Sequence, residues 1–161
     1  MKQYPLARIL DTASFASLWE IGASRELGEA LKDEDSSVRY WAAIGFLSRG
    51  LPRDVNLIER MYGVMNHDKS PSVRIVAAET FARGGKNEPD TPLQTLLELA
   101  QPKGNSVYIR LAALNALDRL GNKARPGLAT IKSWPTDVPK DDRAAAGISR
   151  LIHKIVKQLE Q

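Results

Sequence analysis

The sequence predicts an all-α protein built from stacked helix pairs, and three observations support this prediction. First, four alanine-rich apolar stretches each contain an arginine near their start: Arg39, Arg74, Arg110 and Arg143. These arginines are 35, 36 and 33 residues apart, a period typical of helix-pair repeats that stack along one axis. Second, the apolar residues around each arginine recur at a helical phase. Third, no stretch alternates apolar and polar residues for long enough to predict a strand.

The stretches that contain the arginines are predicted to be the inner helices of the repeats. Counted from the residue before each arginine, apolar residues recur at spacings of four, five, eight and nine, which is one face of an α-helix. Those in the first two stretches are Val38, Ala42, Ala43, Phe46 and Leu47, followed by Val73, Ala77, Ala78, Phe81 and Ala82. The third stretch repeats the pattern with Ile109, Ala113, Leu114 and Leu117. The paired alanines would let a partner helix approach closely.

The partner helices are predicted between these stretches, over residues 15–31, 54–65, 92–100 and 123–134. Ser70-Pro71 and Thr91-Pro92 are typical helix starts, and glycines follow three of the inner helices, where they favour helix ends. The chain is therefore expected to form a single domain over residues 1–161, with four repeats at about 4–50, 51–85, 91–121 and 123–160.

Aspartates recur in phase with the arginines. Six residues before an arginine the sequence has Asp33, Asp68 and Asp137, which correspond to Arg39, Arg74 and Arg143; before Arg110 the position is Gly104. An aspartate in the turn before a helix can cap its first N–H groups, and the arginine can reach the carboxylate of its own or the adjacent repeat. We interpret these residues, with Arg110, as a structural ladder of charge-assisted bonds beside the core. The alternative is a row of ligand-binding charges.

The composition excludes several classes of function. The chain has no cysteine, so thiol nucleophiles, disulfides and cysteine metal sites are absent. Its two histidines, His67 and His153, lie in different predicted repeats without metal-ligand spacing. We therefore expect no catalytic residue, no metal site and no cofactor. No apolar run approaches the roughly 18 residues of a membrane helix, and the first residues lack a secretory signal, so no membrane partner is expected.

Charge is distributed unevenly along the chain. Residues 1–100 contain 12 Lys and Arg against 14 Asp and Glu, whereas residues 101–161 contain 11 against 5, so the balances are −2 and +6. A basic end can attract phosphate or sulfate polyanions. A solvated basic face that keeps the protein soluble is the other interpretation, and weak polyanion binding stays an alternative function.

Some positions on the predicted inner helices lie away from the core phase. They yield the candidate interface residues Trp41, Ile44, Glu79, Arg83, Asn115 and Arg119. Trp41, with Ile44 one turn further on, is the best candidate anchor because large aromatic side chains in desolvated pockets dominate binding energy. Packing between repeats is the alternative role for Trp41.

An aspartate and V-R at fixed spacing, followed by A-A and a terminal glycine, resemble HEAT repeats, which are related to armadillo repeats. The resemblance implies a right-handed α-solenoid of about four helix pairs. The fourth repeat departs from the pattern, with Asp142 and Gly147 on its apolar phase, as a capping repeat would.

A narrower likeness rests on Y-P-L-A-R-I-L-D-T-A, L-K-D-E-D-S-S-V-R-Y-W-A-A-I-G-F-L and I-R-L-A-A-L-N-A-L-D-R-L-G-N-K-A-R-P. Together they resemble the helical-repeat tail of some bacterial sulfatases, including N-sulfoglucosamine sulfohydrolase-like members. The chain lacks the family's C/S-x-P-x-R motif, so no catalytic residue transfers to it, and the resemblance implies an accessory segment beside a sulfatase-like core.

These observations leave two main expectations for function. The first is a non-catalytic scaffold or protein-interaction module that packs against a protein partner or an adjoining domain. The second is a stand-alone binder of polyanions, either DNA or sulfated glycan; a repeat-type lyase or glycosylase would further require an acidic or aromatic catalytic group in its groove. A complete chain is expected in the cytoplasm, and a sulfatase tail in the periplasm or outside the cell.

Overall fold

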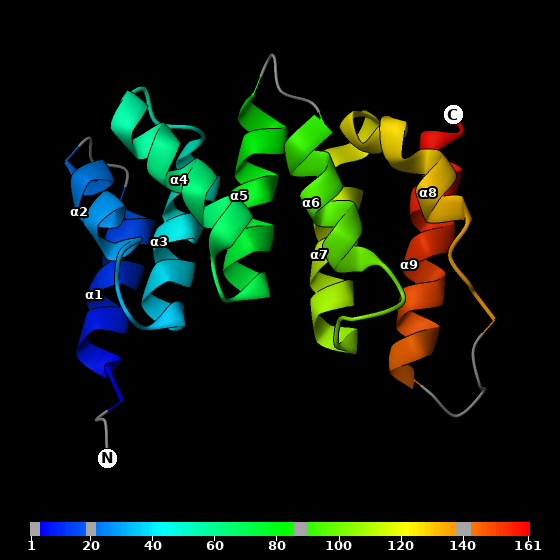
Figure 1. Cartoon of the computed structure of the whole chain (residues 1–161), viewed down its shortest axis with the longest axis horizontal. Coiled ribbons are helices and arrows are strands. Elements are labelled where there is room, and N and C mark those ends of the chain that lie inside the picture. Colours follow the sequence, from blue (N-terminus) through cyan, green and yellow to red (C-terminus); the bar gives the residue numbers. More distant parts are fainter. Residues whose placement is uncertain (1–3, 19–21, 86–89, 138–142) are drawn as a thin grey trace. The chain divides into compact units, whose positions relative to one another are not determined.

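The computed structural model describes residues 4–18, 22–85, 90–137 and 143–161. All regular secondary structure in these residues is helical, without a strand, which confirms the predicted all-α class. The chain divides into two compact units, Met1–Thr80 and Phe81–Gln161 (Figure 1). Each unit is described by itself, and the expected single domain over residues 1–161 stays a prediction.

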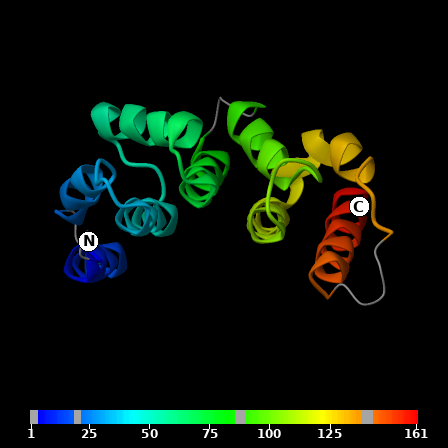
Figure 2. The ribbon, with the colours of Figure 1, turned by 60° about the horizontal axis from the view of Figure 1, so that its bottom comes forward.

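The first unit is a series of helices whose direction alternates along the chain (Figure 1). They are α1 (Leu6–Ser17), α2 (Ala23–Ala30), α3 (Ser36–Arg49), α4 (Val55–His67) and most of α5 (Pro71–Gly84). Helix α3 packs against both α1 and α2. Figure 2 shows α4 in a different layer from α3 and α5.

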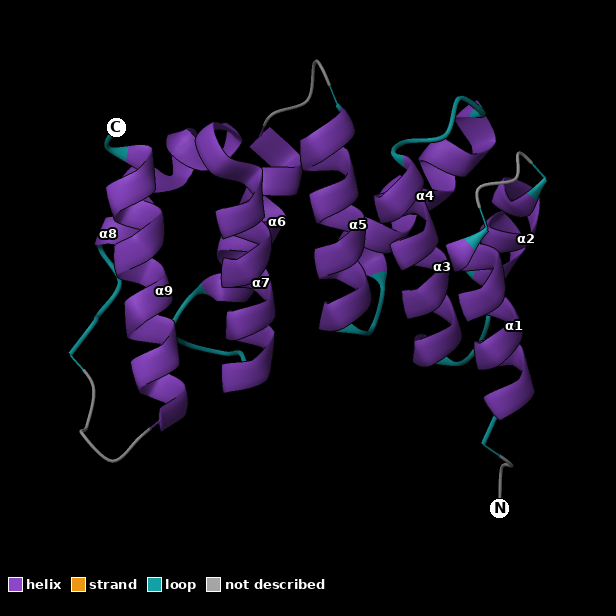
Figure 3. Ribbon diagram, turned by 180° about the vertical axis from the view of Figure 1, so that it is seen from behind, coloured by secondary structure: helices purple, strands orange, loops and turns teal. Residues whose placement is uncertain are grey.

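The second unit also alternates in direction. It consists of α6 (Asp90–Ala100), α7 (Val107–Leu120), the 3₁₀ helix η1 (Gly121–Gly127), α8 (Leu128–Lys132) and α9 (Arg143–Leu159). Helix α7 packs against both α6 and α9, and the view from behind shows α7 and α9 side by side (Figure 3).

The predicted inner helices correspond to α3, α5 and α7, and each has 14 residues. Arg39, Arg74 and Arg110 are each the fourth residue of their helix, so the sequence period reflects a repeated structural position. Most of the predicted apolar phase is buried: Val38, Ala42, Ala43, Val73, Ala77, Ala78, Ala113, Leu114 and Leu117 have at most 2% of their surface exposed. Leu47, Ala82 and Ile109 of the same phase are only half-buried.

Short polar side chains explain where the helices begin. The Asp35 carboxylate accepts a hydrogen bond from the Ser37 N–H at the start of α3, at 2.8 Å. Asp54 accepts one from the Asn56 N–H at the start of α4, also at 2.8 Å. These contacts satisfy N–H groups that have no partner inside the helix. Gly50, with φ of 87°, ends α3 in a conformation that favours glycine.

Two predicted partner helices are wrong in outline. The helix expected over residues 15–31 is divided between α1 and α2, and α1 ends because Leu18 is extended, with φ of −78° and ψ of 138°. The helix expected over residues 123–134 is a 3₁₀ helix followed by the short α8. Pro126 inside η1 has no N–H for an α-helical hydrogen bond, which explains this difference.

Two glycines bring α2 close to its neighbours. A Cβ atom on Gly45 of α3 would lie 2.6 Å from Leu27 Cδ1. A Cβ atom on Gly28 of α2 would clash with the end of the Leu57 side chain from α4. Helix α2 is therefore held between α3 and α4 at distances that only glycine permits without repacking.

Candidate interaction surfaces

Asp33 and Asp68 occupy equivalent places in the turns before α3 and α5. Asp33 Oδ1 accepts a hydrogen bond from the Asp35 N–H, and Asp68 Oδ1 accepts one from the Ser70 N–H, both at 2.8 Å. Each aspartate therefore shapes its turn through the N–H group two residues further on. Both carboxylates also bind an arginine: Asp33 binds Arg8 of α1, and Asp68 binds Arg39 of α3.

Arg39 forms the more buried of these two contacts. Its Nε and Nη2 donate to Asp68 Oδ2 and Oδ1 at 2.6 and 2.8 Å. Its Nη1 donates to the carbonyl oxygens of Asp33 and Glu34 at 2.8 and 3.0 Å. The side chains of Arg39 and Asp68 are only 13% and 4% exposed. The hydrogen bonds that Arg39 donates to Asp68 raise the pKa of Arg39 above its ordinary value.

Arg8 of α1 makes the equivalent contact with the turn before α3. Its Nε lies 3.0 Å from Asp33 Oδ2, and its Nη2 donates to Asp33 Oδ1 at 3.2 Å. The Arg8 side chain is 50% exposed, so water screens this pair more than the Arg39 pair. Arg8 was not among the predicted ladder residues, although it lies 31 residues before Arg39, in the segment Y-P-L-A-R.

The later arginines contact main-chain oxygens. Arg74 Nε donates to the Met65 carbonyl at 3.0 Å, and Arg110 Nε donates to the Ala100 carbonyl at 3.3 Å. Both acceptors lie at or near the C-terminal end of the preceding helix, where carbonyls lack intrahelical partners and favour a cation. Burial lowers the pKa of Arg110 below its ordinary value.

The pair predicted between Asp137 and Arg143 does not form. Asp137 and Arg143 are both exposed, and within the described ranges no ion pair joins them. Gly104, which replaces the aspartate before Arg110, has φ of 90°. In the first unit the carboxylate contacts therefore join α1 to the turn before α3 and α3 to the turn before α5, whereas Arg110 in the second unit contacts a carbonyl oxygen.

The candidate interface residues differ in accessibility. Trp41 is 36% exposed, and its ring meets the Tyr40 ring edge-on with centroids 6.4 Å apart. Ile44 is half-buried, and Arg83, Asn115 and Arg119 are exposed. These five residues stay predicted contact residues.

The predicted outward position of Glu79 is wrong, because its side chain is fully buried. Val76 and Thr80 of the same predicted row are also buried, at 5% and 1% exposure. Helix α5 is therefore buried on the side that carries Val76, Glu79 and Thr80 as well as on the side that carries its predicted apolar residues. The periodicity identified one buried face of α5 but could not show that the opposite phase is also covered.

An exposed apolar face on α1 was not part of the sequence-based prediction. Its members are Tyr4, Leu6 and Leu10, which are 67%, 54% and 57% exposed. Leu6 and Leu10 lie one helical turn apart, whereas the buried residues of α1 are Ile9, Thr12 and Ala16. A shallow surface hollow is lined by Tyr4, Pro5, Leu6, Ala7, Arg8 and Leu10. We call Tyr4, Leu6 and Leu10 the α1 face; Leu18, 43% exposed, follows the other end of α1 and is not part of it.

The described residues contain neither a metal-binding cluster nor a membrane-spanning helix. No group of three or more His, Asp or Glu side chains in these residues could hold a metal ion. Among the described helices, none is long and apolar enough to cross a membrane.

The described residues thus form an all-helical protein that has an exposed apolar face at the start of its first unit. No family model matches the chain, and no curated protein matches its sequence.

Proposed function

We propose that this chain is a non-catalytic helical-repeat scaffold that binds a partner protein through the α1 face. The observation that supports the proposal is the exposure of Leu6 and Leu10, both more than half exposed and one turn apart on one helix. Exposed apolar residues that cluster in this way are typical of interaction sites, whereas single exposed leucines are common on any surface.

The position of the α1 face on its helix indicates what kind of partner surface could bind it. Ile9, Thr12 and Ala16 are the buried residues of α1, and α1 packs against α3. Leu6 and Leu10 lie on another side of α1, so that a further helix could lie against them as α3 lies against the first side. We infer that the partner presents an amphipathic helix with apolar side chains at helical spacing.

The expected strength of this contact is moderate. Burying a leucine completely contributes roughly 1.5–3 kcal/mol, and about half of that is available for side chains that are already half-buried. Arg8 and Asp11 on the same helix are exposed and would form a polar rim. Trp41 and Ile44 on α3 are the candidates for a second contact region in the same unit.

The scaffold is proposed to be of the HEAT type because three 14-residue helices place an arginine at the same fourth position. A sulfatase-like protein is the proposed partner or adjoining domain, on the sequence resemblance alone. The absence of a catalytic role in this chain belongs to the same proposal.

A photo-crosslinking amino acid at Leu10 tests the proposal. The crosslinked protein is identified by mass spectrometry, purified, and titrated against the wild-type chain and a Leu6→Glu, Leu10→Glu variant. The matched control is Val55→Glu, because Val55 is an apolar residue of α4 that is 64% exposed. We expect the double variant to lose at least tenfold in affinity and the control to bind as the wild type does.

Equal binding by the wild type and the double variant would contradict the α1 face as the site. A crosslink only to a second copy of this chain would contradict a separate partner protein. A crosslinker at Val55 that captures the same protein with the same yield would show that the capture is not specific to α1.

A further inference from the structure

Helix α9 carries four cations and no acidic residue over its 17 positions. The cations are Arg143, Arg150, Lys154 and Lys157, and all four are exposed. The opposite side of the helix is apolar, with Ile148, Ile152, Ile155 and Leu159 at most 3% exposed. We call the four cations the α9 stripe.

The four cations are aligned along the helix. An α-helix turns by about 100° per residue, so positions 143, 150, 154 and 157 fall within a sector of about 60°. At 1.5 Å per residue the α9 stripe extends for roughly 21 Å along the helix axis. It therefore presents a straight row of positive charge and not scattered surface lysines.

Protein carboxylates neutralise this row only in part. Lys154 Nζ donates to Asp118 Oδ2 of α7 at 2.6 Å. Glu160 follows the helix but binds Lys132 of α8 at 2.7 Å. Arg150 Nε donates to the Ala146 carbonyl at 3.3 Å, and neither Arg150 nor Lys157 forms an ion pair within the described ranges. Asp141 and Asp142 precede Arg143 in the sequence and lie outside the described residues.

This arrangement costs helix stability. Arg150 and Lys154 are like charges at i,i+4, and Lys154 and Lys157 are like charges at i,i+3, and such like-charge pairs destabilise a helix. An external polyanion along the row would remove this repulsion. Residues 101–161 as a whole have a balance of +6, which would attract the same ligand at longer range.

We propose that the α9 stripe binds the phosphate backbone of double-stranded DNA without sequence preference. Duplex DNA has one charge per about 1.7 Å of its axis, so even three or four cations release condensed counterions when they bind it. Single strands fit less well, because α9 has no Phe, Tyr or Trp on which unpaired bases could stack. This proposal is independent of protein binding by the α1 face, which is on the other unit.

Fluorescence anisotropy with a labelled 20-base-pair duplex tests the proposal on the full chain. Three or four phosphate contacts predict that log K falls against log salt with a slope of about −2.7 to −3.6. An Arg150→Gln, Lys157→Gln variant should reduce the slope by about 1.8 and weaken binding at 50 mM salt by roughly tenfold or more. Circular dichroism checks that the variant keeps its helices.

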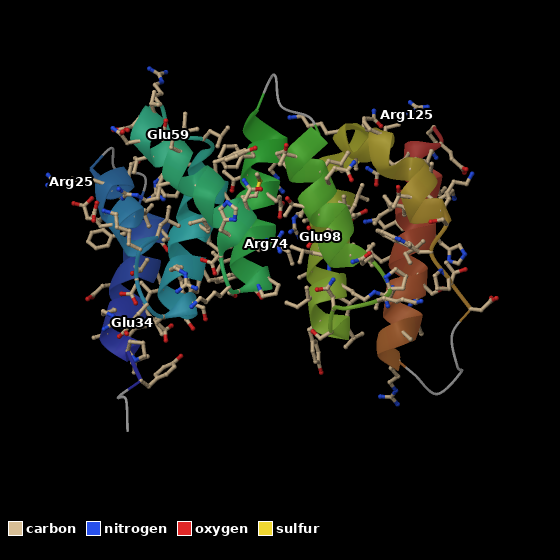
Figure 4. All side chains as sticks on the ribbon, in the orientation of Figure 1. Arg25, Glu34, Glu59, Arg74, Glu98 and Arg125 are labelled. Carbon is tan, nitrogen blue, oxygen red and sulfur yellow. The ribbon has the colours of Figure 1, made fainter. Side chains whose placement is uncertain are left out.

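The matched control is Arg25→Gln with Lys69→Gln, which removes the same charge from two exposed positions in the first unit; Figure 4 shows Arg25 projecting outward from α2. We expect the control to bind within about twofold of the wild type. Equal weakening in both variants would make the effect one of net charge and overturn the α9 stripe as a site. Absence of binding at 50 mM salt would also overturn it, as would tighter binding to heparin or to single-stranded DNA of equal charge.

Discussion

Arg39 and Asp68, 29 residues apart in the sequence, form two parallel hydrogen bonds that join the start of α3 to the turn before α5. The same guanidinium binds the carbonyl oxygens of Asp33 and Glu34 in the turn before its own helix. One arginine thus links two successive turns. The equivalent arginine, Arg8, joins α1 to Asp33 with a more exposed pair.

The difference in burial between these two pairs predicts different energies. Arg39→Ala would leave the Asp68 carboxylate, 4% exposed, without its cation, and breaking a buried pair in this way costs roughly 3–5 kcal/mol. Arg8→Ala breaks an exposed pair with the same geometry, for which about 0–1 kcal/mol is expected. Urea unfolding of both variants, followed by circular dichroism, gives the two free energies.

A double-mutant cycle between Arg39→Ala and Asp68→Ala separates the pair from its surroundings. The coupling should exceed about 1.5 kcal/mol, the lower limit for hydrogen bonds to charged groups. If Arg39→Ala and Arg8→Ala cost the same, burial of the Arg39 pair does not determine its strength.

Much of the fold could be predicted because the sequence repeats. The period of the arginines located α3, α5 and α7, and the apolar phase identified their buried residues. The end of α1 at Ser17 could not be predicted in this way, because Leu18 continues the apolar pattern and no proline stands nearby in the sequence. The η1 segment contains Pro126, a signal that was present in the sequence but assigned to a continuous helix.

The contact surfaces were less predictable than the fold. Periodicity assigns each residue an angle on its own helix, but it does not say how many neighbours surround that helix. Glu79 was therefore placed outward although it is fully buried. Leu6 and Leu10 precede the first predicted partner helix, so no repeat phase applied to them. Arg8 was missed for the same reason.

Replacing a helical glycine by alanine should raise the stability of the protein at Gly63 and lower it at Gly45. Gly63 lies inside α4, and nothing is within 4 Å of a Cβ atom placed there. Gly63→Ala should stabilise the protein by roughly 0.5–1 kcal/mol, since alanine has the better helix propensity. Gly45→Ala should destabilise it by about 1–3 kcal/mol, because its methyl group would displace the fully buried Leu27. Thermal unfolding monitors both, and a stabilising Gly45→Ala would mean that Leu27 repacks without cost.

Glu29 should contribute stability that is lost in acid. Hydrogen bonds from Lys32, and then from Arg60, lower the pKa of Glu29 below 4.5. Because the folded-state pKa is the lower one, the contribution is present above the unfolded-state pKa and disappears as pH falls through the folded-state value. Urea midpoints of Glu29→Gln and the wild type should therefore differ at pH 7 and converge as the pH falls through the lowered folded-state pKa of Glu29.

The control for this pH dependence is Glu59→Gln, since Glu59 projects outward from α4 (Figure 4) and forms no ion pair within the described ranges. Its midpoint should follow that of the wild type at every pH. A constant difference between Glu29→Gln and the wild type from pH 7 to pH 3 would exclude titration of Glu29 as the cause.

Arg49 should determine how firmly α1, and with it the α1 face, is held. Its Nη2 and Nη1 donate to the carbonyls of Phe15 and Ala16 near the end of α1, at 2.5 and 3.2 Å. Arg49→Met keeps the aliphatic contact but leaves these carbonyls without the cation. Burial also lowers the pKa of Arg49, so relief of that desolvation offsets part of the loss. A net cost of about 1–2 kcal/mol is expected, which this offset places around the lower end of the roughly 1.5–3 kcal/mol for hydrogen bonds to charged groups. Amide hydrogens of α1 should exchange faster in Arg49→Met than in the wild type, while the exchange rates of α7 should stay the same.

The control is Arg53→Met, at an exposed position, which should leave exchange unaltered in both helices. Uniform acceleration across α1 and α7 in Arg49→Met would show global destabilisation and not release of α1.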